Sequence, residues 1–292
     1  MLELAVATRA ETFERMRGPL AERGVRARHV RVKERTFAVT DPTVTEAADE
    51  FRGFDAGFVY PTRLMEGDVV DALLSVPWVN DRRAVLTSRN KAGVLARLAR
   101  ADVSVPDTVL VSNPASEADV VEAFDRFDPP VVVKPTSATR GVGVTTVHDR
   151  DSLLGVVDYL DLVHDFRATG DRSYLLQEFL PDALDYRVMV VAGEYAGAVE
   201  RRVPEAGQGG RWKHNVHRNA EATAVDLPDD LRALAETAAD VLDVDFLGVD
   251  LLVSGDRAVV SETNARPTID DASMYEPDFY DRLAELIRSR AR

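Results

Sequence analysis

Two short stretches near the C-terminus, Gly248-Val-Asp250-Leu-Leu and Val260-Ser-Glu262-Thr-Asn264, are the most informative part of this 292-residue sequence. Both are rich in β-forming residues, and the connection between them carries a glycine, as hairpins often do. Side chains alternate between the faces of a strand, so Glu262 and Asn264 share a face, and an antiparallel partner can place Asp250 opposite them. The sequence therefore predicts a hairpin that brings three oxygen-bearing side chains together.

Those three side chains have the composition of a magnesium site. Mg²⁺ prefers oxygen ligands in octahedral geometry and takes only a few from the protein, the rest coming from water and phosphate. Two carboxylates and one amide, from Asp250, Glu262 and Asn264, meet that requirement, with manganese as the alternative ion. The solvated face of an edge hairpin explains the segment alone equally well, because acidic residues are common in this chain.

Lysine is nearly absent from the sequence. Of 36 basic residues only four are lysines: Lys33, Lys91, Lys134 and Lys213. Where one residue type is this rare, the remaining copies are candidates for places that require a compact ammonium group instead of a planar guanidinium. We therefore expect functional lysines among these four.

Lys134 stands between a strand-like run and a small loop. The apolar residues 130–133 lead into Lys134, and the loop that follows contains Gly141 and Gly143. A strand that delivers a lysine into such a loop can place a point charge and backbone N–H groups on phosphate oxygens. The glycine pair lacks the third glycine of a dinucleotide fingerprint and the Gly-Lys-Ser/Thr ending of a P-loop, and an ordinary hairpin turn remains the alternative.

A series of short segments follows the order found in one protein family. The segments are Asn80-Asp81 with Lys91, the run ending at Lys134, Gln177-Glu178-Phe179-Leu180, Asp185-Tyr-Arg187, Glu200-Arg-Arg202, Asn215-Val-His-Arg218, Gly248-Val-Asp250 and Glu262-Thr-Asn264. In this order they resemble ATP-grasp ligases, and most closely the RimK-like glutamate ligases. The resemblance covers essentially the whole chain. It implies an α/β (α+β) protein, in which an ATP-grasp fold follows an open α/β pre-ATP-grasp domain.

The resemblance also implies a role for individual residues. Those implied to bind ATP are Lys91, Lys134, Lys213 and Asn215 at the phosphates, Gly141 and Gly143 in a closing lid, Glu178, Phe179 and Leu180 at adenine, and Asp185 at the ribose. Asp250, Glu262 and Asn264 are implied to hold Mg²⁺. Taken alone, Glu178 and Asp185 are equally explained as ordinary acids at strand ends.

Residues 200–218 form a basic segment in an acidic chain. The segment contains five Lys or Arg against two Glu, whereas the formal net charge of the chain is −14. Such a stretch can attract phosphates and carboxylates that the overall field would repel, and a solvated loop that balances nearby acids is the alternative. His214 and His217 lie three residues apart, but without cysteine a two-histidine metal site is poorly specified, and we do not expect one.

The sequence departs from the RimK-like pattern on the acceptor side. RimK-like enzymes usually read Asn-x-Ser-Pro-Gly after the metal strand and His-Arg-Gly-Gly in the basic loop, whereas this chain reads Asn264-Ala-Arg266-Pro-Thr268 and His217-Arg-Asn219-Ala220. Arg266 resembles the Asn-x-Arg ending of carboxylate- or bicarbonate-activating ATP-grasp enzymes. We hypothesise that its guanidinium grips the acceptor carboxylate or the acyl phosphate. Arg202, Lys213 and Arg266 are the candidate catalytic residues.

The implied reaction is ADP-forming carboxylate–amine ligation. Transfer of the γ-phosphoryl group of ATP gives an acyl phosphate, from which an amine displaces phosphate to form an amide, and positioning with charge neutralisation supplies most of the catalysis. We expect glutamate or another amino acid to be joined to a small-molecule or peptide acceptor. The alternatives are a phosphotransferase of the same fold, a carboxyphosphate-forming enzyme that uses bicarbonate, and a non-catalytic ATP sensor.

Composition excludes other classes of function. With a pI of about 4.9, binding to nucleic acid has little support. The absence of cysteine excludes disulfides and thiol nucleophiles. No apolar stretch approaches the roughly 20 residues needed to span a bilayer, and the N-terminus does not read as a signal peptide, so we expect a cytoplasmic protein without a membrane partner. The resemblance allows a homo-oligomer, but no interface signature is visible.

The order of expected elements divides the chain into three parts. We predict an N-terminal α/β domain at 1–84, a central lid subdomain at 85–178, and a C-terminal subdomain with the metal site at 179–292. Strands are expected at 2–8, 58–60, 174–177, 247–253 and 257–262, and helices at 11–23, 68–75, around Lys91, and at 116–127, 152–164, 228–242 and 278–289.

Overall fold

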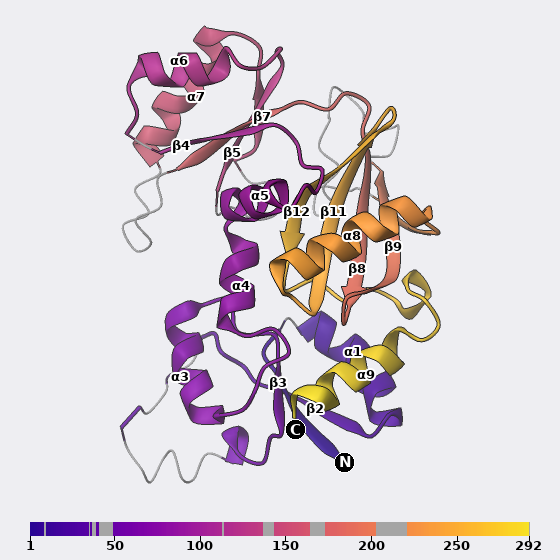
Figure 1. Ribbon diagram of the computed structural model, residues 1–292. Coiled ribbons are helices and arrows are strands. Elements are labelled where there is room, and N and C mark those ends of the chain that lie inside the picture. Colours follow the sequence, from indigo (N-terminus) through magenta and orange to yellow (C-terminus); the bar gives the residue numbers. More distant parts are fainter. Residues whose placement is uncertain are drawn as a thin grey trace.

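The chain forms three β-sheets, which lie one after another along the length of the molecule (Figure 1). The computed structural model describes residues 1–8, 10–34, 36, 39–40, 49–112, 114–136, 143–163, 173–202 and 221–291. A parallel three-stranded sheet lies at one end, an antiparallel four-stranded sheet at the other, and an antiparallel five-stranded sheet between them. The predicted α/β (α+β) class with an open N-terminal sheet is confirmed.

The N-terminal domain is a small parallel sheet of order β2-β1-β3. Its elements are β1 (Leu2–Val6), α1 (Ala10–Glu22), β2 (Val25–His29), the 3-10 turn η1 (Asp49–Phe51), β3 (Ala56–Phe58) and α3 (Leu64–Leu74). The sequence analysis did not predict β2, because Val25-Arg-Ala-Arg-His looks too polar for a strand. The structure shows why the segment qualifies: Val25 and Ala27 are buried, and Arg26 between them points to solvent.

Two consecutive helices connect this domain to the rest of the protein. They are α4 (Arg82–Arg89) and α5 (Lys91–Arg100), and both pack against the five-stranded sheet. Asp81 caps α4 by accepting a hydrogen bond from the Ala84 N–H, and Asn90 caps α5 in the same way through the Gly93 N–H. The Asn90 cap makes Lys91 the first residue of α5, buried against the sheet.

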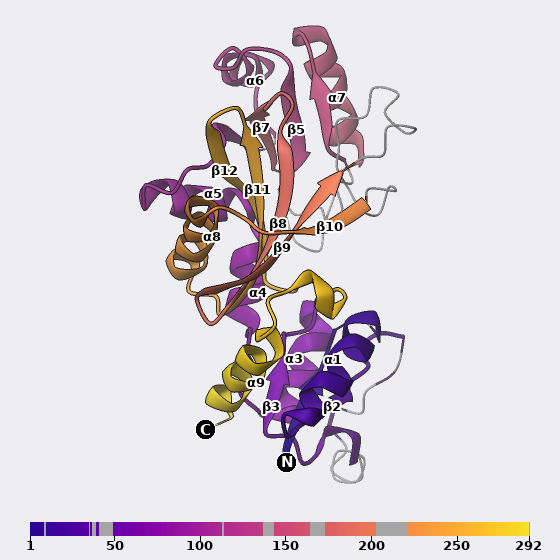
Figure 2. The same cartoon turned by 90° about the vertical axis from the view of Figure 1, so that its right-hand side faces the viewer.

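The central subdomain has a hydrophobic core of its own. Its sheet, of order β4-β7-β5-β6, is covered by two helices; the elements are β4 (Thr108–Val111), α6 (Glu117–Phe124), β5 (Val131–Pro135), β6 (Thr145–Val147), α7 (Arg150–Val163) and β7 (Tyr174–Glu178). The buried cluster that includes Val133, Leu153 and Leu176 contains only residues of this subdomain. The subdomain therefore stands apart from the body of the protein, as Figure 2 shows.

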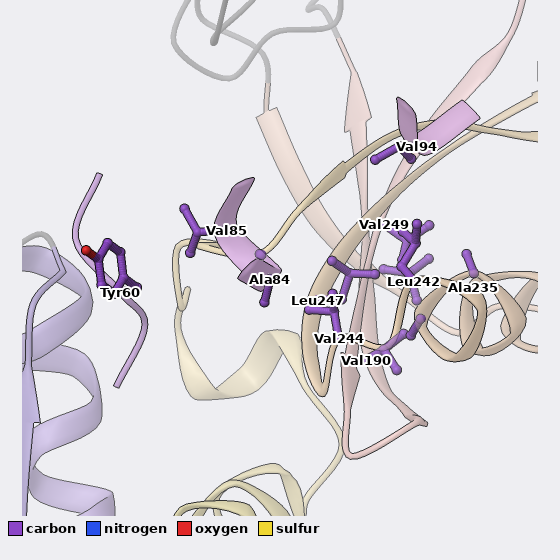
Figure 3. Packing of buried hydrophobic residues seen from close by; sticks show 14 of the residues in the cluster. Tyr60, Ala84, Val85, Val94, Val190, Ala235, Leu242, Val244, Leu247 and Val249 are labelled. Atoms are coloured by element: carbon purple, nitrogen blue, oxygen red, sulfur yellow. The ribbon is translucent and has the colours of Figure 1, made fainter. Parts of the chain in front are cut away.

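The C-terminal subdomain is the five-stranded sheet with one long covering helix. Its elements are β8 (Leu184–Val191), β9 (Glu194–Arg202), β10 (Glu221–Val225), α8 (Asp229–Leu242), β11 (Phe246–Ser254), β12 (Arg257–Asn264) and the 3-10 turn η4 (Ala272–Met274). In Figure 3, Ala235 and Leu242 of α8 face Val190 and Leu247 of the sheet. This burial of aliphatic side chains fixes the sheet that carries the hairpin β11–β12.

Helix α9 (Phe279–Arg290) returns from the C-terminal subdomain to the N-terminal domain, where it packs on α1 and β3. Both chain ends therefore lie in the same domain (Figures 1 and 2). The proposed boundaries at 84/85 and 178/179 stay predictions, but the packing differs from them in two respects. Helices α4 and α5 pack on the C-terminal sheet, and α9 packs on α1 and β3 of the N-terminal domain as well as on β8. No helix within the described ranges combines the length and apolar character needed to cross a membrane.

Candidate functional site

A cleft of about 1810 Å³ separates the central subdomain from the five-stranded sheet and reaches the N-terminal domain. Strand β5 contributes Lys134 to its wall, the segment after β7 contributes Phe179 and Leu180, and α5 contributes Lys91. The hairpin β11–β12 contributes Asp250, Glu262 and Asn264, and β8 and β9 contribute arginines. The cleft thus gathers side chains from all parts of the chain.

The hairpin has the register that the sequence predicts. Strands β11 and β12 pair antiparallel, with Asp250 opposite Glu262 and Gly248 opposite Asn264. A β-bulge follows Asp250, and bulges commonly re-aim a side chain near functional sites. A Cβ at Gly248 would stand 3.3 Å from the guanidinium of Arg187, so glycine leaves room for that arginine beside Asp250.

Asp250 is buried and neutralised by two arginines. Arg187 forms a two-pronged ion pair with its carboxylate, one contact being 2.9 Å long, and Arg201 lies 3.4 Å from the other oxygen. Burial disfavours the charged carboxylate, but Arg187 and Arg201 outweigh that cost and hold the pKa of Asp250 below its usual value. Asp250 therefore remains ionised inside the protein.

Glu262 forms an ion pair with Lys91 of helix α5, which packs against the hairpin strand β12. The Nζ of Lys91 lies 3.0 Å from the Glu262 carboxylate, whose side chain is 39% exposed, whereas that of Lys91 is 7% exposed. Lys134 is equally buried in the same part of the cleft. Burial, together with repulsion from Lys91, lowers the pKa of Lys134 to about 8, although Glu262 and Asp250 act in the opposite direction.

This low pKa, together with the predicted phosphate contact of Lys134, predicts that nucleotide binding depends on pH. Above pH 8 the free protein loses the Lys134 charge, and a phosphate that requires the ammonium must then bind together with a proton. We expect the dissociation constant for ATP to rise as pH increases above 8, by up to about tenfold per pH unit. Calorimetric titration between pH 7 and 9.5 measures this slope. The Lys134→Arg variant keeps its charge throughout, and an equal slope in that variant would assign the effect to another group.

Arg201 is a site residue that the sequence analysis missed. Its side chain is 15% exposed and pairs with Asp185 as well as Asp250, whereas the side chain of Arg202 is 72% exposed and pairs with Glu200. Successive residues of β9 point to opposite faces, and this alternation was the signal that could have selected Arg201. Arg187, which the sequence offered only as part of the segment Asp185-Tyr-Arg187, is a second such residue and pairs with Asp250. A catalytic role for Arg202 remains a prediction.

Asp185 and Glu178, implied to bind ribose and adenine, already have protein partners. The Asp185 carboxylate accepts two hydrogen bonds from Arg201. That of Glu178 accepts one from the Asp107 N–H and one from Arg257, each 2.7 Å long. Asp107 lies where the chain enters the central subdomain, just before β4, and Glu178 lies where the chain leaves it, at the end of β7. Through the hydrogen bond from Arg257, Glu178 therefore connects both segments to the β11–β12 hairpin. Its backbone neighbours Phe179 and Leu180 line the cleft, and their contact with adenine remains a prediction.

The donor set of the hairpin fits a hard cation. Asp250 and Glu262 offer carboxylate oxygens, and Asn264 offers its Oδ1, which accepts a hydrogen bond of 2.9 Å from the Arg266 N–H. Oxygen ligands of this kind suit Mg²⁺ or Mn²⁺. No group of three or more His, Cys, Asp or Glu side chains suited to a metal occurs among the described residues, so the amide of Asn264 is required to complete the predicted set.

Several predicted residues lie outside the described ranges. They are Gly141 of the expected lid, and Lys213 and Asn215 of the basic segment; His214 and His217, at which no metal site is expected, also lie outside them. Gly143 is described, and its φ of +74° with Pro135 at 2.9 Å from the position of a Cβ shows that the end of this loop requires glycine.

The site concentrates positive charge in an acidic chain. Lys91, Lys134, Arg187 and Arg201 meet Asp185, Asp250 and Glu262, which leaves more cations than carboxylates, against a chain net charge of −14. This excess attracts anions locally.

A cleft between two antiparallel sheets, with a lysine from each side and carboxylates on a hairpin, defines the ATP-grasp class.

Solved structures and curated proteins agree with this class. D-cycloserine synthetase DcsG superposes with a TM-score of 0.73 at 18% identity, over 99% of this chain and 100% of that one. The ATP-grasp ligase PsnB gives 0.69 at 15% identity, over 99% and 98%. The family model of the RimK-like ATP-grasp domain matches residues 88–287, so this chain belongs to the RimK-like ATP-grasp family.

Curated relatives match at about the same level in different bacteria. A probable alpha-L-glutamate ligase of Klebsiella pneumoniae (strain 342) is 31% identical over 66% of this chain, and the chain spans 60% of its length. A ribosomal protein bS6--L-glutamate ligase of Escherichia coli O139:H28 (strain E24377A / ETEC) is 30% identical over the same shares, 66% and 60%. The activities in these names belong to those proteins.

Proposed function

We propose that this protein is an ATP-dependent carboxylate–amine ligase that forms ADP through an acyl phosphate. The observation that carries the proposal is the convergence of Lys91, Lys134, Arg187 and Arg201 around the Asp250–Glu262 pair in one cleft. This arrangement suits transfer of a phosphoryl group, in which negative charge must be neutralised while the reacting oxygens are aligned. The substrates proposed are ATP, a small-molecule or peptide carboxylate, and glutamate or another amino acid.

Each cation has a distinct part in this proposal. Lys91 and Lys134 neutralise phosphate oxygens from two sides of the cleft, since one comes from α5 and the other from β5. Arg187 and Arg201 keep Asp250 ionised, and an ionised carboxylate is the form that binds a metal. Asp250, Glu262 and Asn264 would hold a divalent cation, which would supply positive charge to neutralise the phosphate during transfer.

The proposed chemistry proceeds in two balanced steps. An acceptor carboxylate oxygen attacks the γ-phosphorus, and the bond to the β-phosphate oxygen breaks, which releases ADP and leaves an acyl phosphate. The nitrogen of the amine then attacks the carbonyl carbon, the carbon–oxygen bond to phosphate breaks, and the nitrogen loses a proton to solvent. Neither step requires a protein nucleophile, in keeping with a chain that lacks cysteine.

The bicarbonate alternative loses its main support. The sequence favoured it only through Arg266, whose guanidinium donates hydrogen bonds to backbone carbonyls of the N-terminal domain. The phosphotransferase and sensor alternatives are separated from ligation by experiment.

Magnesium-dependent ADP release, measured with pools of carboxylates and amino acids and followed by mass spectrometry of the products, tests the proposal. We expect an amide product from the unaltered protein and from Glu122→Ala, which removes an exposed acid on α6 outside the cleft. Glu262→Ala should abolish it. ADP release without consumption of an amine would establish a phosphotransferase, and dependence on bicarbonate a carboxyphosphate-forming enzyme. ATP binding without ADP release from any pool would favour a sensor.

A further inference from the structure

The segment that follows β12 is anchored to the N-terminal domain by one arginine. The guanidinium of Arg266 donates to the carbonyl oxygens of Val59 at 3.0 Å and of Ala7 at 2.9 Å, and also to that of Tyr60. Ala7 follows β1, and Val59 and Tyr60 follow β3, the parallel neighbour of β1. A single side chain therefore joins the carboxyl ends of two adjacent strands.

The chain turn at Val59 is unusual and is held from both sides. Val59 has a φ of +51°, a conformation that is rare and costly for a β-branched residue. Its carbonyl and that of Tyr60 both face Arg266, while the Tyr60 N–H donates to the Asn80 carbonyl at 2.8 Å. Such a conformation persists only when surrounding contacts hold it in place. The hydrogen bonds from Arg266 are among those contacts.

The other end of this connection is the predicted metal site. The backbone N–H of Arg266 donates to Oδ1 of Asn264 at 2.9 Å. Between them, the Ala265 N–H donates to the Ser88 hydroxyl at 2.9 Å, and the Ala265 carbonyl accepts a bond of 2.7 Å from the buried side chain of Asn80. Ala265 and Arg266 are both held by hydrogen bonds, and together they link the Asn264 amide to the N-terminal domain.

We propose that Arg266 is a positioning residue, which fixes the N-terminal wall of the cleft relative to Asn264. That wall, which includes Thr8, Arg31 and Arg63, lies in the part of the cleft formed by the N-terminal domain, whereas Lys134 belongs to the central subdomain. This positioning role rests on the proposed ligase function and replaces the hypothesis that Arg266 grips the acceptor.

The two roles of Arg266 predict different kinetics. Loss of positioning leaves both substrates bound but misaligned, and a displacement of about 1 Å can lower turnover by about 100-fold. Loss of a direct contact that is equally strong in the ground state and the transition state raises KM and leaves kcat unchanged. The split between kcat and KM therefore distinguishes a positioning residue from an acceptor ligand.

The experiment compares Arg266→Gln and Arg266→Lys with a matched variant at the same domain interface. Arg15→Gln removes contacts of α1 with Ile269 and Asp270 but touches neither Asn264 nor the turn at Val59. For Arg266→Gln we expect kcat to fall by about 100-fold, with an unchanged dissociation constant for ATP. Arg266→Lys should lose almost as much, because one ammonium cannot reach carbonyls on two strands. Arg15→Gln should retain kcat within about twofold, as is usual for surface ion pairs.

Hydrogen exchange tests the same inference without any activity. Backbone amides of residues 56–60 should exchange faster in both Arg266 variants than in the unaltered protein or in Arg15→Gln, because the turn loses its anchor. Unchanged exchange there, or a raised acceptor KM with normal kcat, or full activity of Arg266→Lys, would overturn the positioning role. If no acceptor supports ADP release at all, the proposed function fails, and the exchange measurement still decides the role of Arg266.

Discussion

Lys134→Met should lower turnover by about 100- to 1,000-fold, the usual loss when one preorganised electrostatic group is removed from a phosphoryl-transfer site. The same change should leave the free energy of unfolding at pH 7 unchanged or raise it. The pKa of Lys134 is lowered from 10.5 to about 8 by burial, so the folded protein holds the charged lysine less favourably than the unfolded chain does. The unfavourable free energy of keeping Lys134 charged in the folded protein applies in full below pH 8 and disappears above pH 10.5.

The control for Lys134→Met is a cation outside the cleft. Arg100 is exposed at the end of α5 and does not line the site, so Arg100→Met should alter neither turnover nor unfolding by a large amount. Urea denaturation and ADP release are measured on the same preparations. A Lys134→Met protein that is both inactive and clearly less stable would show that Lys134 supports the fold, and the assignment to phosphate binding would lose its basis.

Asp250→Asn should destabilise the protein by about 3–5 kcal/mol, the cost of breaking a buried ion pair from one side. The amide keeps the shape of the side chain but removes the charge that Arg187 and Arg201 share. Both guanidinium groups would then lie in the protein interior without their common counter-charge. The measurement is the free energy of unfolding from urea denaturation, with the slope checked for two-state behaviour.

Glu262→Gln provides the matched comparison, because Glu262 is the direct cross-strand partner of Asp250. Its side chain is 39% exposed and that of its partner Lys91 is 7% exposed, so loss of this half-buried ion pair should cost less free energy of unfolding than loss of the buried Asp250 carboxylate. Both variants remove a predicted metal ligand, so both should lose magnesium-dependent turnover, and Asp250→Asn should lose more stability than Glu262→Gln. If both variants lost the same free energy of unfolding, the charge of Asp250 would not be what stabilises Arg187 and Arg201 inside the protein.

Much of the fold could be predicted from local patterns. The hairpin β11–β12 was predictable because alternation and a turn glycine fix both register and face, and the structure pairs Asp250 with Glu262 as expected. Helix α8 and helix α9 show clear helical periodicity. Strand β2 was missed because its two buried positions, Val25 and Ala27, alternate with basic residues whose exposure only the neighbouring β1 reveals.

The candidate site was predictable in its lysines and carboxylates, and less so in its arginines. Rarity marked Lys91 and Lys134, but 32 arginines offer no comparable signal. The choice between Arg201 and Arg202 depended on which face of β9 turns toward Asp185 and Asp250, and this follows from pairing with β8. The contacts of Arg266 with Ala7, Val59 and Tyr60 span between 206 and 259 positions along the chain, and no local pattern encodes contacts over such a separation.

The position of helix α9 has a consequence for the order in which the protein can be made. During synthesis β1, α1 and β3 emerge before the two ATP-grasp subdomains, whereas Leu283 and Ile287 of α9, which share a buried cluster with Leu4, Leu20 and Phe58, emerge after them. The apolar surface of the first domain remains uncovered while the two ATP-grasp subdomains are synthesised. This domain is therefore completed only after both subdomains have been synthesised, and its apolar surface is open to chaperones during that time.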